Sequence, residues 1–413
     1  MPGSEIVSGP AGIHYILAFD HGSVSAGRKL KSGCGQPCNL QLAALNLQPV
    51  TNWRLMLHYK LVPVLAFSID PSVFWPYAAG AAILAVGLPI VMLGHVRRAH
   101  GLDKLTAFGP LLFAVAMAVF GADHFVSAKF VASIVPSFIP WHLFWAYFVG
   151  VALIAGALSF ATTILWRLAA GSFALMFLIF ELTMHIPNLI AVPHSKPRLI
   201  LLLRDIPFLA AGLAFAASRM RVAATPGAPR TAESEMRGTE SEIPGTDPKM
   251  PGALLSNSAR KRLVTVACAL MAIPIGFFGI EHFLNPHFAP GIPQDDPRLT
   301  IPMPNWLPMH LFWIYLTGSI FVISAIALIT LRYARPAALL IGATVLLMVA
   351  LVYIPVTIAR AGDVNNGLNY VCIHFALAGA ALMLAGSLPS HSAASAGAPE
   401  KEPALDQVAT SSS

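Results

Sequence analysis

Charged residues are scarce in this sequence. Only 11% of the 413 residues are Asp, Glu, Lys or Arg, whereas 56% are hydrophobic. A soluble globular domain carries about a quarter charged residues. Several apolar runs also reach the roughly 20 residues that a helix needs to cross a bilayer. The composition therefore excludes an ordinary soluble domain and predicts an all-α, multi-pass membrane protein.

Cysteine is scarce as well, and the familiar catalytic motifs are absent. The four cysteines are Cys34 and Cys38, spaced C-x-x-x-C, and Cys268 and Cys372, which fall in apolar runs. This pattern predicts no disulfide framework. The sequence has no glycine-rich phosphate loop with its lysine and no Gly-x-Ser-x-Gly. Nothing in it indicates nucleotide hydrolysis or hydrolase chemistry.

Two blocks of sequence occur twice in the same order. Gly121–Phe125 matches Gly279–Phe283, and Pro136–Gly150 matches Pro304–Gly318 at a distance of 168 residues. In the longer block Pro, Pro, His, Leu, Phe, Trp, Tyr and Gly recur at the same positions. Blocks repeated in order indicate an internal duplication. The loop between the blocks is longer in the second copy, and its extra residues include Pro290–Pro293.

The alternation of apolar and polar segments predicts the domain organisation. We expect a disordered N-terminal extension, an extra transmembrane helix with a basic turn, two four-helix units called unit 1 and unit 2, a flexible linker between them and a disordered tail. The extension covers residues 1–55, the extra helix with its turn 56–104, unit 1 105–217, the linker 218–260, unit 2 261–387 and the tail 388–413. The nine expected spans cover about 73–95, 105–125, 141–166, 170–187, 199–217, 261–283, 308–331, 336–355 and 367–387.

The basic residues predict the orientation of the spans. The net charge is +7, and Lys and Arg gather beside the apolar runs, for example in the turn after the first span and at Arg332 and Arg335. Positive residues favour the cytoplasm, which places the linker and the tail there, in a bacterial inner membrane. Lys196, Arg198 and Arg360 are exceptions. Topology thus explains the charge, and we predict no nucleic-acid partner.

The repeated blocks resemble the DoxX family of four-helix integral membrane proteins. Gly-x-Glu-His-Phe, a loop, Pro-x-Trp-Leu-Pro and a Gly-bearing helix carry the resemblance in unit 2, and the first copy carries it nearly as well. The resemblance covers both units but not the extra helix, the linker or the tail. It implies a link to membrane redox chemistry and quinones, although most relatives have no assigned reaction. Two fused units depart from the single-unit pattern.

Unit 1 has charged residues inside its apolar runs. Glu181 and Arg204 lie about 8–9 Å inside the ends of their predicted helices, at 1.5 Å per residue. Charges inside a span are costly and suggest a functional site. We therefore predict that Glu181 pairs with Arg204, with Asp205 nearby. His185 shares the helix face of Glu181, four residues later.

Unit 2 lacks these charges. The equivalents of the three charged residues are Val349, Val371 and Cys372, while Tyr353 replaces the histidine and His374 appears as a new polar residue. Independent surface charges have no reason to disappear as a set. Unit 2 is therefore predicted to be a packing partner with at most a weaker site.

The remaining polar residues come from the repeated blocks. Histidines and carboxylates here could bind a metal, move protons at a quinone or cap helix ends, and the sequence commits to no metal. The candidate ligand-binding residues are Glu181, His185, Arg204, Asp205, His124 and His142. The candidate residues of a secondary site are Glu281, His282, His310, Tyr353 and His374.

The sequence leads to one hypothesis and two alternatives. The hypothesis is a redox-associated membrane subunit that binds a quinone, or a similar small amphiphile, at the extracytoplasmic side of unit 1. Its partners would be the lipid bilayer and another membrane redox subunit. The alternatives are a non-enzymatic scaffold or partner-binding membrane protein, and a small-solute transporter. No reaction is assigned.

Overall fold

A computed structural model describes residues 4–8, 14–20, 23–27, 70–219, 257–293, 303–364 and 367–389. The chain divides into two parts, Met1–Phe67 and Ser68–Ser413. The second part is called the helical body below.

The N-terminal part contains a small antiparallel sheet. Its strands are β1 (Ser4–Ser8), β2 (His14–Asp20) and β3 (Ser23–Gly27), in the order β1-β2-β3. Disorder was expected throughout residues 1–55, and these strands differ from that expectation. The apolar run at 13–19 is too short to span a membrane, and it is rich in aromatic and β-branched residues, which favour strands. Most of this run lies in β2. The rest of the stretch lies outside the described residues.

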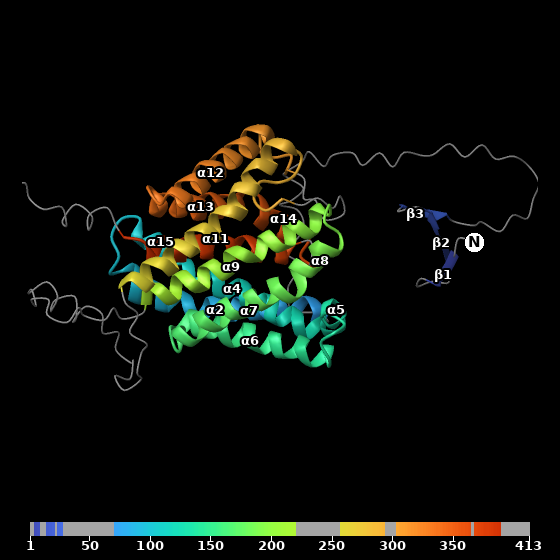
Figure 1. Ribbon diagram of the computed structural model, residues 1–413. Helices are drawn as coiled ribbons and strands as arrows, with labels where there is room; N and C mark the ends of the chain where they lie inside the picture. The colour runs from blue at the N-terminus through green and yellow to red at the C-terminus, as the bar shows by residue number, and fades with distance from the viewer. Residues whose placement is uncertain are drawn as a thin grey trace, which may run out of the picture. The chain divides into compact units, whose positions relative to one another are not determined.

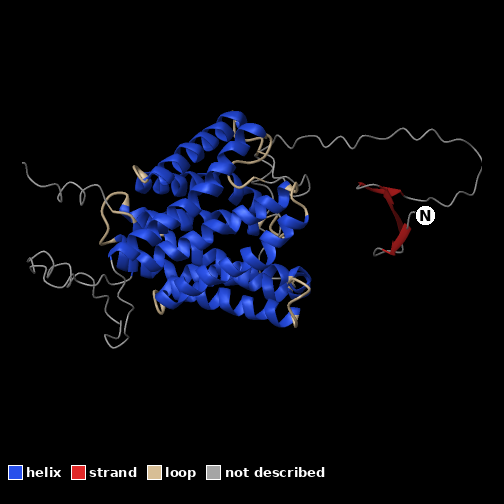
Figure 2. Cartoon of the chain, viewed as in Figure 1, coloured by secondary structure: helices blue, strands red, loops and turns tan. Residues whose placement is uncertain are grey.

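The helical body confirms the prediction of an all-α polytopic membrane protein. Among the described residues, nine helices are long and apolar enough to cross a membrane. They are Pro71–Val96, Asp103–Val126, His142–Thr162, Leu168–Ala191, Lys196–Ala217, Ser258–Leu284, His310–Thr330, Ala334–Ala359 and Leu368–Ser387. Figure 2 shows this part as helices joined by short loops.

The first span begins with a cap. Pro71 opens α2 (Pro71–Ile90), where its missing N–H costs nothing. The Asp70 carboxylate accepts hydrogen bonds from the main-chain N–H and the hydroxyl of Ser72, at 2.9 and 2.7 Å. These bonds stabilise the charged form and lower the pKa of Asp70. The span ends as a π-helix, η1 (Val91–Val96).

Unit 1 has four long helices and several short ones. They are α3 (Asp103–Thr106), α4 (Gly109–Val126), α5 (Ala128–Ile134), α6 (His142–Thr162), α7 (Trp166–Phe180), η2 (Glu181–His185), α8 (Ile186–Ala191) and α9 (Lys196–Arg219). The third span of the unit is therefore made of α7, the π-helix η2 and α8 in succession. The end of unit 1 at which α4 ends and α6 begins is called the His142 end below.

Unit 2 follows the same order. It comprises α11 (Asn257–Leu284), α12 (His310–Thr330), α13 (Ala334–Met348), η3 (Val349–Tyr353), α14 (Ile354–Ala359) and α15 (Leu368–Ser387). From α6 to α8 and from α12 to α14, each helix begins and ends exactly 168 residues after its counterpart. Trp141 and Met309, which precede α6 and α12, are both left-handed with φ 58° and ψ 51°. The two copies thus share local backbone geometry as well as residues.

The two units share one hydrophobic core. The helix α15 packs against α4 and α9, and α9 packs against α11. In Figure 1 these helices lie between the pair α6 and α7 on one side and α12 and α13 on the other. Small residues allow the close approach, since a Cβ on Gly109 would lie 2.9 Å from the Met383 main-chain nitrogen. The units therefore form one body rather than two separate bundles.

Candidate functional site

Four polar residues of unit 1 come together near the His142 end. The π-helix η2 supplies Glu181 and His185, and α9 supplies Arg204 and Asp205. The Asp205 carboxylate accepts a hydrogen bond from Arg204 Nε at 2.9 Å and one from His185 Nε2 at 3.2 Å. Asp205 therefore holds the side chains of Arg204 and His185 in place, and these four residues are called the unit 1 cluster.

Glu181 has no such partner. It is 5% exposed, and neither of its carboxylate oxygens has a hydrogen-bond partner within the described part of the chain. It interacts with Asp205 and Arg204 only through electrostatics. The predicted Glu181–Arg204 pair is therefore wrong, because the guanidinium bonds to the adjacent Asp205 instead.

The predicted pairing of Glu181 assumed a regular α-helix, and the π-helix η2 explains why that prediction is wrong. A π turn inserts one residue into the helix and rotates the side chains relative to a regular α-helix, and such turns are frequent at functional sites. Pro187 follows η2 in the first turn of α8. A proline clashes with the carbonyl four residues before it, here that of Thr183, and the wider turn relieves this clash. Pro355 follows η3 in the same way, so the prolines were a usable signal.

The other two candidate residues of unit 1, His124 and His142, are not bonded to the cluster. His124 Nδ1 donates to the Phe120 carbonyl at 2.7 Å, which leaves Nε2 as a bare acceptor. His142 is half-buried at the start of α6. Among the described residues, neither His124 Nε2 nor the His142 ring makes a hydrogen bond or ion pair.

In unit 2 the expected secondary site is filled by the chain itself. His282 and His374 are 0% exposed, and Tyr353 is also buried. His282 Nε2 accepts the main-chain N–H of Gly291 at 3.0 Å, and His374 Nε2 accepts that of Ile292 at 3.2 Å. The Tyr353 hydroxyl donates to the Pro290 carbonyl at 3.0 Å.

These three side chains hold a segment of the longer loop between the repeated blocks. The main chain of Pro290–Ile292 lies in their midst, and we call this segment the plug. The rings of Tyr353 and His374 stack with centroids 3.8 Å apart, and Ile292 is fully buried. The insertion is visible in the sequence, but its inward fold onto these residues depends on contacts that are distant along the chain.

The other two residues of the secondary set have structural partners. Glu281 is 5% exposed and forms an ion pair with Lys196 of unit 1 at 2.7 Å, while Asn285 donates to the same carboxylate oxygen. Lys196, an exception to the charge rule, is thus paired across the units. His310 Nε2 donates to the Pro304 carbonyl at 3.0 Å and fixes the turn before α12.

Asp123 is the unit 1 counterpart of Glu281. Its side chain is hydrogen-bonded to that of Asn369 on α15. Each acidic residue of the repeated Gly-x-acid-His-Phe block therefore contacts a residue of the other unit, on or at the start of its last helix. These two contacts join the units at the His142 end.

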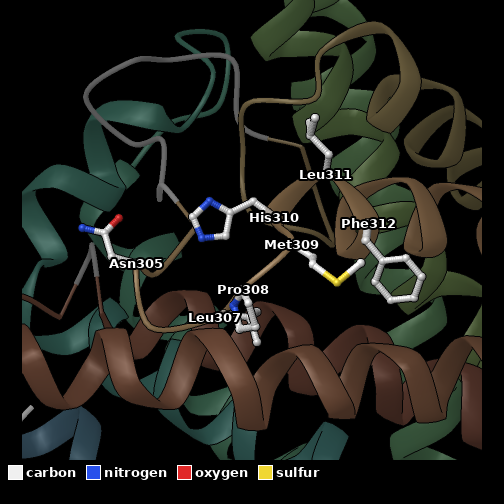
Figure 3. A pocket seen from close by; sticks show the side chains of 7 residues that line it. All are labelled: Asn305, Leu307, Pro308, Met309, His310, Leu311 and Phe312. Carbon is white, nitrogen blue, oxygen red and sulfur yellow. The ribbon is translucent and has the colours of Figure 1, made fainter.

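A surface hollow of about 500 Å³ lies beside the start of α12. It is lined by Asn305, Leu307, Pro308, Met309, His310, Leu311 and Phe312. In Figure 3 the His310 ring turns toward Asn305, whereas Met309 and Phe312 point the other way. The hollow includes no residue of the unit 1 cluster, and its one titratable side chain already bonds to a carbonyl. It is therefore a weaker candidate site than the cluster.

The described residues contain no group of three or more His, Cys, Asp or Glu side chains arranged to hold a metal ion. The metal alternative thus has no geometric support in this part of the chain.

Comparison with family models, with curated proteins and with solved structures found no match for this chain. The resemblance to the DoxX family therefore stays a prediction from the repeated blocks.

Proposed function

We propose that this integral membrane protein binds a small amphiphile with a polar head group, such as a quinone, at the unit 1 cluster. The observation that carries the proposal is Glu181, a carboxyl group that is buried in a membrane-spanning helix without a hydrogen-bond partner. An unpaired buried polar group is costly, and an ionisable residue within a span marks a functional site by default. A bound head group would supply the missing partner.

The cluster divides into a fixed part and a part that can face a ligand. Asp205 orients Arg204 and His185 through its two hydrogen bonds. Only one guanidinium nitrogen is used in this way, and the Arg204 side chain remains 26% exposed. Its other N–H groups can donate to an oxygen of the head group, while Glu181 can accept from a hydroxyl or exchange a proton with it.

The proposal also includes an internal duplication, kinship with the DoxX family and an orientation in the membrane. The matching helix lengths and left-handed residues of the two units support an internal duplication. The repeated blocks support kinship with the DoxX family and, with it, a redox-associated role beside a second membrane subunit. The positive residues support an inner-membrane orientation with the cluster on the extracytoplasmic side.

A scaffold role is the second candidate, and it is favoured for the residues that join the units. Glu281 and Asp123 both bond across to the other unit, and the plug occupies His282 and His374. In this view unit 2 supports the structure of unit 1, and the ligand binds to unit 1 alone.

Purification in a mild detergent tests the proposal. One sample is divided among an absorption spectrum, metal analysis and mass spectrometry of the lipid extract. We expect a co-purified amphiphile in the wild-type protein and its loss in Glu181→Gln. Glu281→Gln is the matched control, because this carboxylate is equally buried but has a protein partner. An extract without a specific amphiphile, or one that Glu181→Gln leaves unchanged, would count against the site.

A further inference from the structure

The unit 1 cluster offers no uncompensated cation to a ligand. Arg204 is its one permanently charged cation, because a guanidinium is not deprotonated in proteins. Arg204 Nε lies 2.9 Å from Oδ1 of Asp205, and Asp205 is buried. A carboxylate at this distance forms a charge-assisted hydrogen bond with the guanidinium and balances its charge. The cation that an anionic ligand would need is therefore already neutralised by the chain.

The other two residues of the cluster add no positive charge. His185 Nε2 lies 3.2 Å from Oδ2 of Asp205, and a neutral imidazole suffices for this bond because its N–H donates. Glu181 is a second acid, which is buried and interacts electrostatically with both Asp205 and Arg204. With His185 neutral, the net charge of the cluster is zero when Glu181 is protonated and minus one when it is ionised.

An anionic head group would make this balance worse. The cluster lies in the spans Leu168–Ala191 and Lys196–Ala217, and charges interact strongly in an environment of low dielectric constant. A carboxylate or phosphate beside Arg204 would meet two acids of the chain, and at least one negative charge would stay buried without compensation. Buried charges are tolerated when they are paired. An uncharged head group avoids this cost and still offers oxygens to the N–H groups of Arg204 that Asp205 does not use.

The second unit indicates that these charges form one set. The three equivalent positions hold Val349, Val371 and Cys372, which are all buried. Loss of Asp205 alone would leave Arg204 uncompensated within a span, which is costly. A neutral acceptor could make both hydrogen bonds of Asp205, but only a carboxylate also balances the guanidinium. The charge of Asp205 therefore has a consequence for ligands that its hydrogen bonds do not have.

We propose that Asp205 is the specificity-determining residue of the unit 1 cluster and restricts it to amphiphiles with an uncharged, oxygen-bearing head group. Because Asp205 balances the charge of Arg204, the guanidinium serves as a hydrogen-bond donor to a carbonyl, ether or hydroxyl oxygen. Fatty acids and phospholipids, whose head groups carry a carboxylate or a phosphate, are rejected. The inference rests on the proposed function and defines the class of its ligand by charge.

Binding of a matched pair of quinones tests this inference. A hydroxynaphthoquinone with an alkyl chain is an anion at about pH 8, where histidine is ordinarily neutral. Its methyl ether has the same ring and chain but no charge. The full-length protein in detergent is titrated with each compound at this pH. We expect the wild-type protein to bind the ether about ten-fold more tightly than the anion.

Variants of Asp205 separate its charge from its hydrogen bonds. Asp205→Asn keeps the shape and an acceptor oxygen, and it should lower the ratio of the two affinities by about ten-fold. The double variant Glu181→Gln/Asp205→Asn leaves Arg204 as the one charge of the cluster and should prefer the anion. Asp205→Cys, which places the unit 2 residue at this position, serves if the asparagine variant does not fold.

Glu281→Gln is the matched control, because this buried carboxylate lies outside the cluster and its loss should leave the ratio unchanged. Equal affinities in the wild-type protein, tighter binding of the anion, or a ratio that no substitution of Asp205 changes would overturn the inference and leave an amphiphile site of another specificity. Failure of both compounds to bind the wild-type protein would overturn the proposed function together with the inference.

Discussion

Among the described residues, Glu181 is buried without a hydrogen-bond partner, and this burial opposes folding. A buried polar group without a hydrogen bond costs about 1–3 kcal/mol. Its counterpart in unit 2 is Val349, which is buried without such a cost. Proteins keep such residues where activity requires them, at the expense of stability.

We predict that Glu181→Val stabilises the ligand-free protein. Valine has nearly the volume of glutamate and removes the unsatisfied carboxyl group, so the free energy of unfolding should rise by about 1 kcal/mol or more. Thermal unfolding of the protein in detergent, after bound lipids have been removed, measures the change. Glu281→Val should do the opposite, since it leaves Lys196 without its carboxylate. A lower unfolding temperature for Glu181→Val would show that the carboxyl group has a stabilising partner.

Gly291 is the residue on which the plug depends. Its φ of +137° disfavours any residue with a side chain, and a Cβ here would collide with the His374 ring. We predict that Gly291→Ala destabilises the protein by roughly 1–3 kcal/mol, the usual cost of a strained backbone residue. Gly171→Ala is the control, because a Cβ there meets nothing within 4 Å in α7. Equal unfolding temperatures for the two variants would contradict the account of the plug.

At the scale of elements, the spans were predictable and their mutual contacts were not. Hydropathy is a local property, so the nine apolar runs identify the nine helices. The partner of His185 depends instead on η2, whose extra residue changes which side chains face α9. The plug likewise depends on Tyr353 and His374, which lie far along the chain from Pro290. Such contacts are set by tertiary packing and leave little trace in a local pattern.

The start of α9 and the end of α11 are joined by an ion pair whose strength can be measured. Lys196 and Glu281 pair at 2.7 Å, with side chains 30% and 6% exposed. Residues in direct contact show coupling energies of about 0.5–3 kcal/mol. We expect a value within this range from a double-mutant cycle of Lys196→Met and Glu281→Gln, measured by thermal unfolding.

Arg198→Met provides the comparison for that cycle. Arg198 donates to the Asn188 carbonyl within unit 1 and should combine additively with Glu281→Gln. Additivity in the Lys196 cycle as well would mean that the ion pair contributes nothing to the union of the units.

At the scale of the whole molecule, the shared core determines how the chain can be divided. The central helices of each unit pack against those of the other, with α15 between α4 and α9 and with α11 against α9. Two fragments cut between α9 and α11, when produced together, should therefore assemble into one complex of equal stoichiometry. Affinity purification through a tag on one fragment measures this. Recovery of the tagged fragment alone would contradict a shared core.

Because the two units belong to one chain, their pairing does not depend on the protein concentration, as the pairing of two separate chains would. Two halves of one polypeptide meet at an effective concentration that dilution does not change, so the pairing survives at any expression level. Mutations can then accumulate in one half without appearing in the other. The plug is described in unit 2 alone, so under the proposed function each polypeptide should bind a single equivalent of ligand.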